Sequence, residues 1–296
     1  MKNSRPLANS ASRTLLRAAL HRLWHNKVAI IAFAIVLLIV LGMPLGLLFA
    51  PHDYTHTNLA AEATHLPPSF SNGHFFGTDD LGRDLFARVM LGGCISIGVG
   101  LVCALVSLLI GVAYGATAGY VGGRVDTIMM RVVEILYALP FMFFVILLMV
   151  FFGRNIFLLF VAIGFVSWLD IARIVRGQTL SLKQKDFIEA VKLSGASTPR
   201  IIFKHIVPNL FGVVIVYATL TIPHVILVES FLSFLGLGVQ EPWTSWGTLI
   251  NEGRSQTIMR DEVWRLIIPS AFLAILVLAL NVLGDALRDA LDPKDS

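Results

Sequence analysis

The sequence predicts an all-α integral membrane protein with six transmembrane helices. Of its 296 residues, 56% are hydrophobic and 14% are charged, which is too apolar for a soluble domain. The apolar runs are about 20 residues long, the length that crosses a bilayer as a helix, and they do not alternate as barrel strands do. Because lipid offers backbone polar groups no partners, helices that satisfy these groups internally are expected.

The chain begins with a basic segment that is expected to lie on the membrane surface. Residues 1–27 contain six lysines and arginines and no acidic residue. Leucines, alanines and Trp24 fall on one helical arc with basic residues opposite, which is typical of an interfacial helix on the inner leaflet. The alternative is the start of a cleaved signal peptide, but the following apolar run, 28–50, is longer than a signal core. This run is the first predicted span.

A polar loop is predicted from 51 to about 90. Its cluster 77–84, Gly-Thr-Asp-Asp-Leu-Gly-Arg-Asp, is expected to form a structural turn in which Thr78 caps a short helix. Carboxylates can also serve acid/base chemistry, but no partner nucleophile is visible. A metal site is conceivable from the histidines of the loop, although no tight ligand pair falls on a predicted helix and a solvated loop is favoured. These histidines are His52, His56, His65 and His74.

Five further spans are predicted, at about 95–119, 132–152, 156–175, 210–232 and 266–283. The first of these is rich in small residues, which let helices approach closely in lipid. Pro140 and Pro223 are expected to kink their spans. Cys94 and Cys103 are nine positions apart on one predicted helix, about 13 Å along its axis, so no mutual disulfide is expected. Four tryptophans are expected at the membrane interfaces, namely Trp168, Trp243, Trp246 and Trp264.

Two regions follow from this order of elements. Residues 1–92 hold the interfacial helix, the first span and the polar loop, and residues 93–296 hold a core of five spans. With six spans both termini share one side of the membrane, and that side carries 17 of the 23 lysines and arginines. The excess marks the cytoplasmic side. The N- and C-termini and the segment 181–208 are therefore expected in the cytoplasm.

The segment 181–208 is polar within an apolar chain. It carries five lysines and arginines against two acids, Asp186 and Glu189. Phe187, Ile188 and Val191 are predicted to share one helical face. One apolar side on a short surface helix suits docking into a groove of a partner protein.

A turn and a second short helix are predicted after this face. Gly195 breaks the helical pattern as a C-terminal glycine does. Ser197 or Thr198 followed by Pro199 is typical of a cap and a first-turn proline. An ordinary amphipathic loop between spans remains the alternative to a docking segment.

If the chain moves a solute across the membrane, its sequence constrains the energy source. No Gly-x-x-x-x-Gly-Lys-Ser/Thr phosphate loop occurs, so ATP-driven transport requires a separate ATPase. A carrier driven by ions needs titratable groups in the bilayer, and the candidates are Glu134, His224 and Glu229. Both glutamates fall near predicted span ends, which favours helix packing over a proton relay. No inverted repeat is visible, which argues against several carrier designs. A membrane-embedded enzyme would need a convergent catalytic set, and none is evident, so an enzyme is not expected.

The polar segment also resembles a known family. Glu189-Ala190, with Gly195 six residues and Pro208 nineteen residues after the glutamate, resembles the EAA loop of ABC-importer permeases. The third position of the triplet departs from the pattern, since it is Val191. Segment 76–88 resembles a segment that precedes the second span in the dipeptide, oligopeptide and nickel branch of these permeases. The segments that are similar to the inner-membrane C subunit of oligopeptide permeases are 140–148, 166–183, 229–238 and 284–294.

The resemblance implies the type I ABC-importer permease fold in a bacterial cytoplasmic (inner) membrane. It implies a heterodimer with a homologous second permease, two cytoplasmic ATP-binding subunits that use the ATP, and an extracytoplasmic peptide-binding protein. No cofactor, metal or nucleic acid is expected on this chain itself. A dipeptide, nickel or other small-solute permease of the same branch, or a stand-alone ion-coupled carrier, is the alternative. The residues that would contact the ATPase are Asp186, Phe187, Glu189, Ala190, Gly195 and Pro208.

Overall fold

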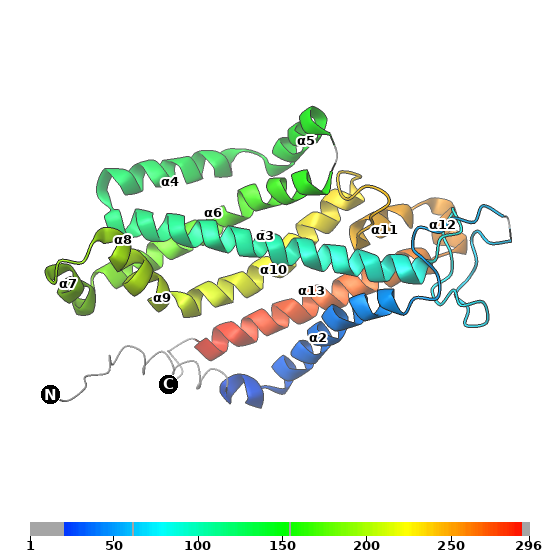
Figure 1. Ribbon diagram of the computed structural model, residues 1–296, viewed down its shortest axis with the longest axis horizontal. Helices are drawn as coiled ribbons and strands as arrows, with labels where there is room; N and C mark the ends of the chain where they lie inside the picture. The colour runs from blue at the N-terminus through cyan, green and yellow to red at the C-terminus, as the bar shows by residue number, and fades with distance from the viewer. Residues whose placement is uncertain (1–20, 61, 154, 292–296) are drawn as a thin grey trace.

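The computed structural model describes residues 21–60, 62–153 and 155–291, and every element named within them is a helix. Long helices run side by side along the longest axis of the molecule (Figure 1). The expected interfacial helix falls mainly on residues 1–20, outside the described part, and its last turn at 21–25 is helical. The all-helical class predicted from composition is confirmed.

Five helices of the described chain are long and apolar enough to cross a membrane. A bent pair of helices, α4 and α5, is long and apolar enough only when its two halves are taken together, and counted as one span it makes six. The five long helices are α2 (Lys27–Leu48), α3 (Leu85–Val121), α6 (Ile156–Lys183), α10 (Phe211–Phe234) and α13 (Trp264–Leu291). The bent pair is α4 (Gly123–Ala138) and α5 (Phe141–Phe152).

The structure interrupts the expected span 132–152 at Pro140, where a kink is predicted, and gives it an earlier start. Its helix begins at Gly123, and α4 and α5 meet at an angle of 78°. Leu139 is extended, with φ −72° and ψ 126°, and Pro140 precedes α5. A proline lacks the N–H that would continue the helix and disfavours helical geometry in the residue before it, so the chain breaks here instead of bending gently. Pro223, in contrast, stays inside the continuous helix α10.

The second span begins well before its predicted start. Helix α3 starts about ten residues earlier than expected, because Asp84 caps it by accepting a hydrogen bond of 2.8 Å from the backbone N–H of Ala87. The predicted capping role of Thr78 is wrong. Its hydroxyl accepts a hydrogen bond from the N–H of Leu66 and donates one to the carbonyl of Ala63, so it ties the 77–84 turn to an earlier part of the loop.

Segments that the sequence predicts on the same side of the membrane lie at the same end of the molecule. The start of α2, the end of α13 and the short helices after α6 lie at one end (Figure 1). The loop 49–84 lies at the other end with α11 (Trp246–Glu252) and α12 (Gln256–Asp261). With the positive charges concentrated at the first end, this arrangement fits the predicted cytoplasmic side.

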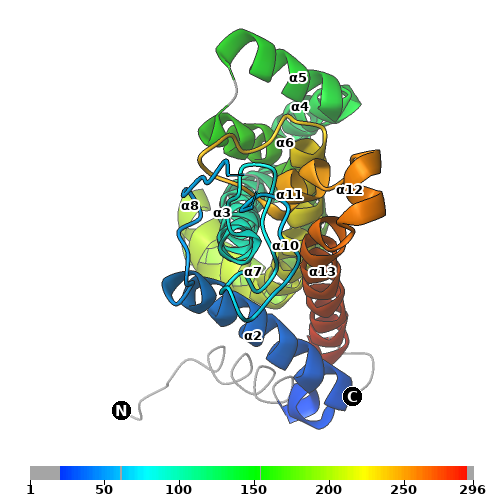
Figure 2. The same cartoon turned by 90° about the vertical axis from the view of Figure 1, so that its right-hand side faces the viewer.

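Helix α3 lies near the centre of the bundle when the molecule is viewed along its length (Figure 2). It packs closely on α6 through Gly111, Gly115 and Gly119, which recur every fourth residue. A Cβ atom on Gly115 would overlap the carbonyl oxygen of Ala172, and one on Gly119 would lie 2.8 Å from that of Arg176. The prediction that small residues bring helices together is confirmed in this pair.

The tryptophans do not all lie where interfacial anchors belong. Trp246 is 0% exposed, and its indole N–H donates to the carbonyl of Val89 at 3.0 Å. Trp168 is buried against Tyr114, with ring centroids 4.9 Å apart. Both interfacial expectations are therefore wrong, because these rings fill the helix-packing core. Trp243, at 49% exposure, remains a surface residue. Cys94 and Cys103 are both free, as their positions on one helix required.

Candidate functional site

The polar segment 181–208 includes a series of short helices that follow α6. These are α7 (Asp186–Leu193), α8 (Thr198–Ile201), the π-helical turn η1 (Ile202–Ile206) and α9 (Val207–Asn209). They form the far end of the molecule, opposite α11 and α12 (Figure 1). Acids in the first turn of α7 and Lys192 in its last turn match the helix dipole.

A cluster of buried isoleucines fixes these short helices to the bundle. Ile188 of α7 is 2% exposed and Ile206 of η1 is 0% exposed. They pack with Ile201 and Ile202 against Val175 of α6 and against residues of α3. The loop is therefore held on α3 and α6 by apolar burial, and a force applied to α7 reaches both long helices.

The turn between α7 and α8 has the conformation that its glycine predicted. Gly195 has φ +81°, a value that favours glycine, and its N–H donates to the carbonyl of Lys192 at 3.1 Å. No atom lies within 4 Å of where its Cβ would stand, so backbone strain and not crowding limits substitution. Ser197 precedes α8 and Pro199 lies in its first turn, as expected, although the serine side chain makes no capping hydrogen bond.

The predicted contact residues are all on the outer surface of this loop. Asp186, Phe187, Glu189, Ala190, Gly195 and Pro208 are exposed. The predicted apolar docking face is partly wrong, however, since Ile188 and Val191 turn inward and pack on the helix bundle of this chain. The large apolar side chains that face outward from α7 are Phe187, 42% exposed, and Leu193, 82% exposed.

Leu193 was missed by the sequence interpretation. Its signal was available, because it falls off the face shared by Ile188 and Val191 and is therefore an apolar residue on the solvent side of a short helix. Together Phe187, Glu189, Ala190 and Leu193 form what we call the α7 outer face. An exposed surface of this kind, on a loop held rigidly by its inner side, is typical of a protein contact.

Polar contacts join the C-terminal end of α6 to the neighbouring helices. Lys183 donates a hydrogen bond of 2.6 Å to the carbonyl oxygen of Tyr120, at the end of α3. Arg176 donates two hydrogen bonds, of 2.5 and 2.6 Å, to the carboxylate of Asp126 in α4. A two-bond pairing of guanidinium and carboxylate fixes orientation as well as distance. These hydrogen bonds thus connect helices α3, α4 and α6 at the end of α6 that leads into α7.

A network of ion pairs occupies the opposite end of the molecule. The buried guanidinium of Arg88, in α3, donates to Asp79 at 2.6 Å and to Glu252 of α11 at 2.7 and 2.9 Å. Arg83 bridges the same Asp79, at 2.8 Å, and Glu241, at 2.7 Å. The expectation that 77–84 forms a structural turn is confirmed, and these contacts tie the turn to the segment between α10 and α13.

A second set of ion pairs links the same turn to α13. Arg265 donates to Asp80 and to Glu262, both at 2.7 Å. Its hydrogen bond holds the pKa of the Asp80 carboxyl below the ordinary value. His65 Nδ1 lies 2.7 Å from a Glu262 oxygen, and this residue has φ +60°, an uncommon value for a non-glycine residue. The turn is therefore held from both sides.

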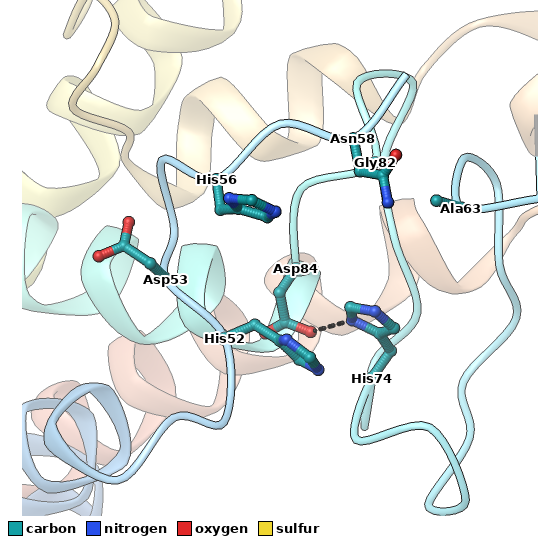
Figure 3. Close-up of a pocket in the computed structure, with 8 residues that line it drawn as sticks. All are labelled: His52, Asp53, His56, Asn58, Ala63, His74, Gly82 and Asp84. Atoms are coloured by element: carbon teal, nitrogen blue, oxygen red, sulfur yellow. Dashed lines mark hydrogen bonds and ion pairs between the residues drawn. The ribbon is translucent and has the colours of Figure 1, made fainter. Parts of the chain in front are cut away.

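The other three histidines of the loop surround a small pocket (Figure 3). His74 Nδ1 lies 2.8 Å from the buried carboxylate of Asp84, and the rings of His52 and His74 are stacked with centroids 4.1 Å apart. His56 lines the same pocket, while the carboxylate of Asp53 points away from the His74–Asp84 pair (Figure 3). Within the described residues, no three metal-ligating side chains converge on one point. The contacts support the cap of α3.

The three titratable candidates of the spans differ in their surroundings. Glu229 is 0% exposed and accepts hydrogen bonds from Ser96 of α3 at 2.9 Å and from Ser233 at 2.7 Å. It joins α10 to α3, which fits the helix-packing role favoured from the sequence. Glu134 is exposed and lies 3.0 Å from Arg131, and His224 is exposed on α10.

Comparison with known proteins covers nearly the whole chain. A family described as "Binding-protein-dependent transport system inner membrane component" matches residues 107–294, and "N-terminal TM domain of oligopeptide transport permease C" matches residues 14–68. The chain is 51% identical over 300 residues to the oligopeptide transport system permease protein OppC of Escherichia coli (strain K12), covering 99% of this chain and 98% of that protein.

Two further relatives are also matched over most of their length. The Haemophilus influenzae oligopeptide transport system permease protein OppC is 50% identical over 285 residues, which are 96% of this chain and 90% of that protein. The Bacillus subtilis (strain 168) dipeptide transport system permease protein DppC is 48% identical over 276 residues, 93% and 85% respectively. This chain therefore belongs to the family of inner membrane components of binding-protein-dependent transport systems.

Proposed function

We propose that the chain is a permease subunit of an ATP-driven oligopeptide importer. The observation that carries this proposal is full-length similarity to proteins named as oligopeptide permeases, combined with a rigidly mounted, outward-facing α7 at the basic end of the molecule. In this proposal the chain forms the translocation path with a homologous second permease. Two cytoplasmic subunits hydrolyse ATP, and an extracytoplasmic protein delivers the peptide.

The role of the α7 outer face is to receive force from an ATPase subunit. Phe187 and Leu193 supply apolar area for a groove, and Glu189 supplies a charge that can fix orientation in it. Movement of α7 is passed to α6 and α3 through the buried isoleucines and through the bond from Lys183 to Tyr120. This chain has no phosphate-binding loop, so the ATP chemistry belongs to the partners.

The proposal is tested with the complete assembly in proteoliposomes. A labelled oligopeptide, presented with its binding protein, is expected to accumulate only when ATP is on the cytoplasmic side, and an uncoupler is expected to have no effect. Uptake that proceeds without ATP and collapses with the uncoupler would indicate an ion-coupled carrier instead.

Matched variants then test the coupling residue. Glu189→Ala is expected to abolish uptake and peptide-stimulated ATP hydrolysis, whereas Glu62→Ala, an exposed glutamate in the loop at the other end, is expected to leave both unchanged. Equal activity in the two variants would remove Glu189 from the coupling site.

A dipeptide importer is the second candidate, because a dipeptide permease is 48% identical to this chain. Competition in the same uptake assay separates the two functions. Unlabelled dipeptide that displaces the labelled oligopeptide at equal concentration would favour the dipeptide assignment.

A further inference from the structure

Helix α4 presents three different strips along its length. One strip faces α6 and is built around Val133, which is 0% exposed and packs with Trp168 and Leu169. The second strip is apolar and exposed, and it consists of Ile128, Val132 and Ile135 with exposures of 65%, 42% and 58%. The third strip is polar and exposed, and it consists of Thr127, Arg131, Glu134 and Tyr137. The two exposed strips repeat with the same spacing of four and three residues, so they run parallel at the same depth.

The polar strip lies on α4, which is long and apolar enough to cross the membrane when it is taken together with α5. Glu134 is eleven residues beyond Gly123, the start of α4, which places it about 16 Å along the helix. The side chains of Arg131 and Glu134 are 70% and 55% exposed in this subunit, and they form an ion pair at 3.0 Å. Charges that face lipid at such depth cost about 2.5–3.5 kcal/mol each, whereas the neighbouring apolar strip faces lipid at no such cost. The apolar strip therefore belongs to the lipid side, and the polar strip to water or protein.

Helix α6 adds charges next to this polar strip. Asp170 and Arg173 are exposed and lie on one face of α6, three residues apart. Asp170 is close to the midpoint of the helix, fourteen residues after Ile156 and thirteen before Lys183. The guanidinium carbon of Arg173 lies 4.2 Å from the ring centroid of Tyr137, which joins the two helices into one surface.

We propose that this surface, the charged strip of Arg131, Glu134, Tyr137, Asp170 and Arg173, lines the translocation path and contacts the peptide during transport. The inference rests on the proposed import function. The strip offers two cations, two anions and a phenol ring, so its net charge is zero. That composition matches a zwitterionic peptide, because it provides partners for an ammonium terminus, a carboxylate terminus and the polar backbone without selecting one net charge.

The test uses single cysteines in the complete importer reconstituted in liposomes. Cys94 and Cys103 are first replaced by alanine to give a cysteine-free parent. Cysteine is then placed on the charged strip, in Arg131→Cys and Glu134→Cys, and on the lipid strip of the same helix, in Val132→Cys and Ile135→Cys. The probe is a charged, water-soluble thiol reagent, which reacts with the ionised thiol and therefore needs water at the site.

We expect modification of the charged-strip cysteines to be about tenfold faster than modification of the lipid-strip cysteines, since a thiol in lipid stays protonated. Binding protein loaded with oligopeptide, added with ATP, is expected to slow only the charged-strip reaction. Equal rates on both strips would overturn the inference. A charged strip that stays unreactive in every nucleotide state would also overturn it, because it would then be buried against the second permease.

Failure of the inference can be told apart from failure of the proposed function. The cysteine-free parent is assayed for ATP-dependent oligopeptide uptake before any labelling. If the parent transports oligopeptide and the two strips react equally, only the location of the path is wrong. If the parent and the unmodified chain both fail to transport oligopeptide, the proposed function itself is wrong.

Discussion

Leu193 provides the most direct test of the α7 outer face. It is 82% exposed in the isolated subunit, so its side chain contributes little to the fold and is available to a partner. Leu193→Ala removes three carbons, and at about 0.8 kcal/mol per buried methylene, scaled by this exposure, the loss on docking is about 2 kcal/mol. That loss corresponds to an approximately 30-fold weaker Kd for the ATPase subunit.

The assay is titration of the permease pair in lipid nanodiscs with purified ATPase subunit. The matched control is Leu59→Ala, because Leu59 is 72% exposed but lies in the loop at the opposite end of the molecule. We expect Leu193→Ala to weaken binding and to reduce ATP-dependent uptake, with the thermal unfolding midpoint unchanged. The control is expected to leave all three unchanged. Identical Kd values for the two variants would refute the assignment of the α7 outer face.

Three further predictions concern other parts of the chain. Gly195→Asp is expected to block uptake while membrane insertion stays normal, since a non-glycine residue at φ +81° is strained by about 1–2 kcal/mol. Gly195→Asn, which tolerates this region better, should retain more uptake. Equal uptake by both variants and the parent would contradict this reasoning. Arg88→Met is expected to destabilise the assembly by about 3 kcal/mol, because buried Asp79 loses one of its two guanidinium partners and partly buried Glu252 loses the guanidinium that it pairs with, and its unfolding midpoint should fall further than that of Glu252→Gln. Because Arg265 lowers the pKa of Asp80, the charged Asp80 stabilises the fold above its unfolded pKa, and this contribution is lost as the pH falls through the lower folded pKa. The stability difference between the parent and Asp80→Asn should therefore be constant near neutral pH and disappear only in acid, and a difference that grew on acidification would contradict the sign.

Hydropathy and charge predicted the parts of the fold that depend on lipid. Runs of apolar residues located the five long helices and the bent pair of α4 and α5, and the lysine and arginine count grouped the segments that share an end of the molecule. Hydropathy missed the first ten residues of α3, because Arg88 is a charged residue there. In the structure its guanidinium is buried in ion pairs with Asp79 and Glu252, which lie 9 and 164 positions away in the sequence. Such long-range pairing has no local signature. The break at Pro140 was located correctly, but its 78° angle depends on how α5 packs on α6.

Segment 181–208 also shows which features follow from local sequence and which depend on tertiary packing. Gly195 and the proline of the second helix could be placed from turn chemistry alone. The direction of α7 could not, because Ile188 and Phe187 are neighbours in sequence and equally apolar, and only the packing of η1 decides which one turns inward. The charged strip was equally hidden, since it is assembled from residues of α4 and α6 that single-helix patterns treat separately.

The length of α3 has a consequence for how the two sides of the membrane communicate. Its 37 residues form a rod about 55 Å long. The capped turn lies at one end, and at the other end the carbonyl oxygen of Tyr120 accepts a hydrogen bond from Lys183. Tilting such a rod by about ten degrees carries one tip roughly 10 Å past the other, which is the scale of a small peptide. A modest displacement at the Lys183 end is thus enough, through stiffness alone, to move the capped turn at the other end, and the ion pairs between α3 and α11 must either move with it or break.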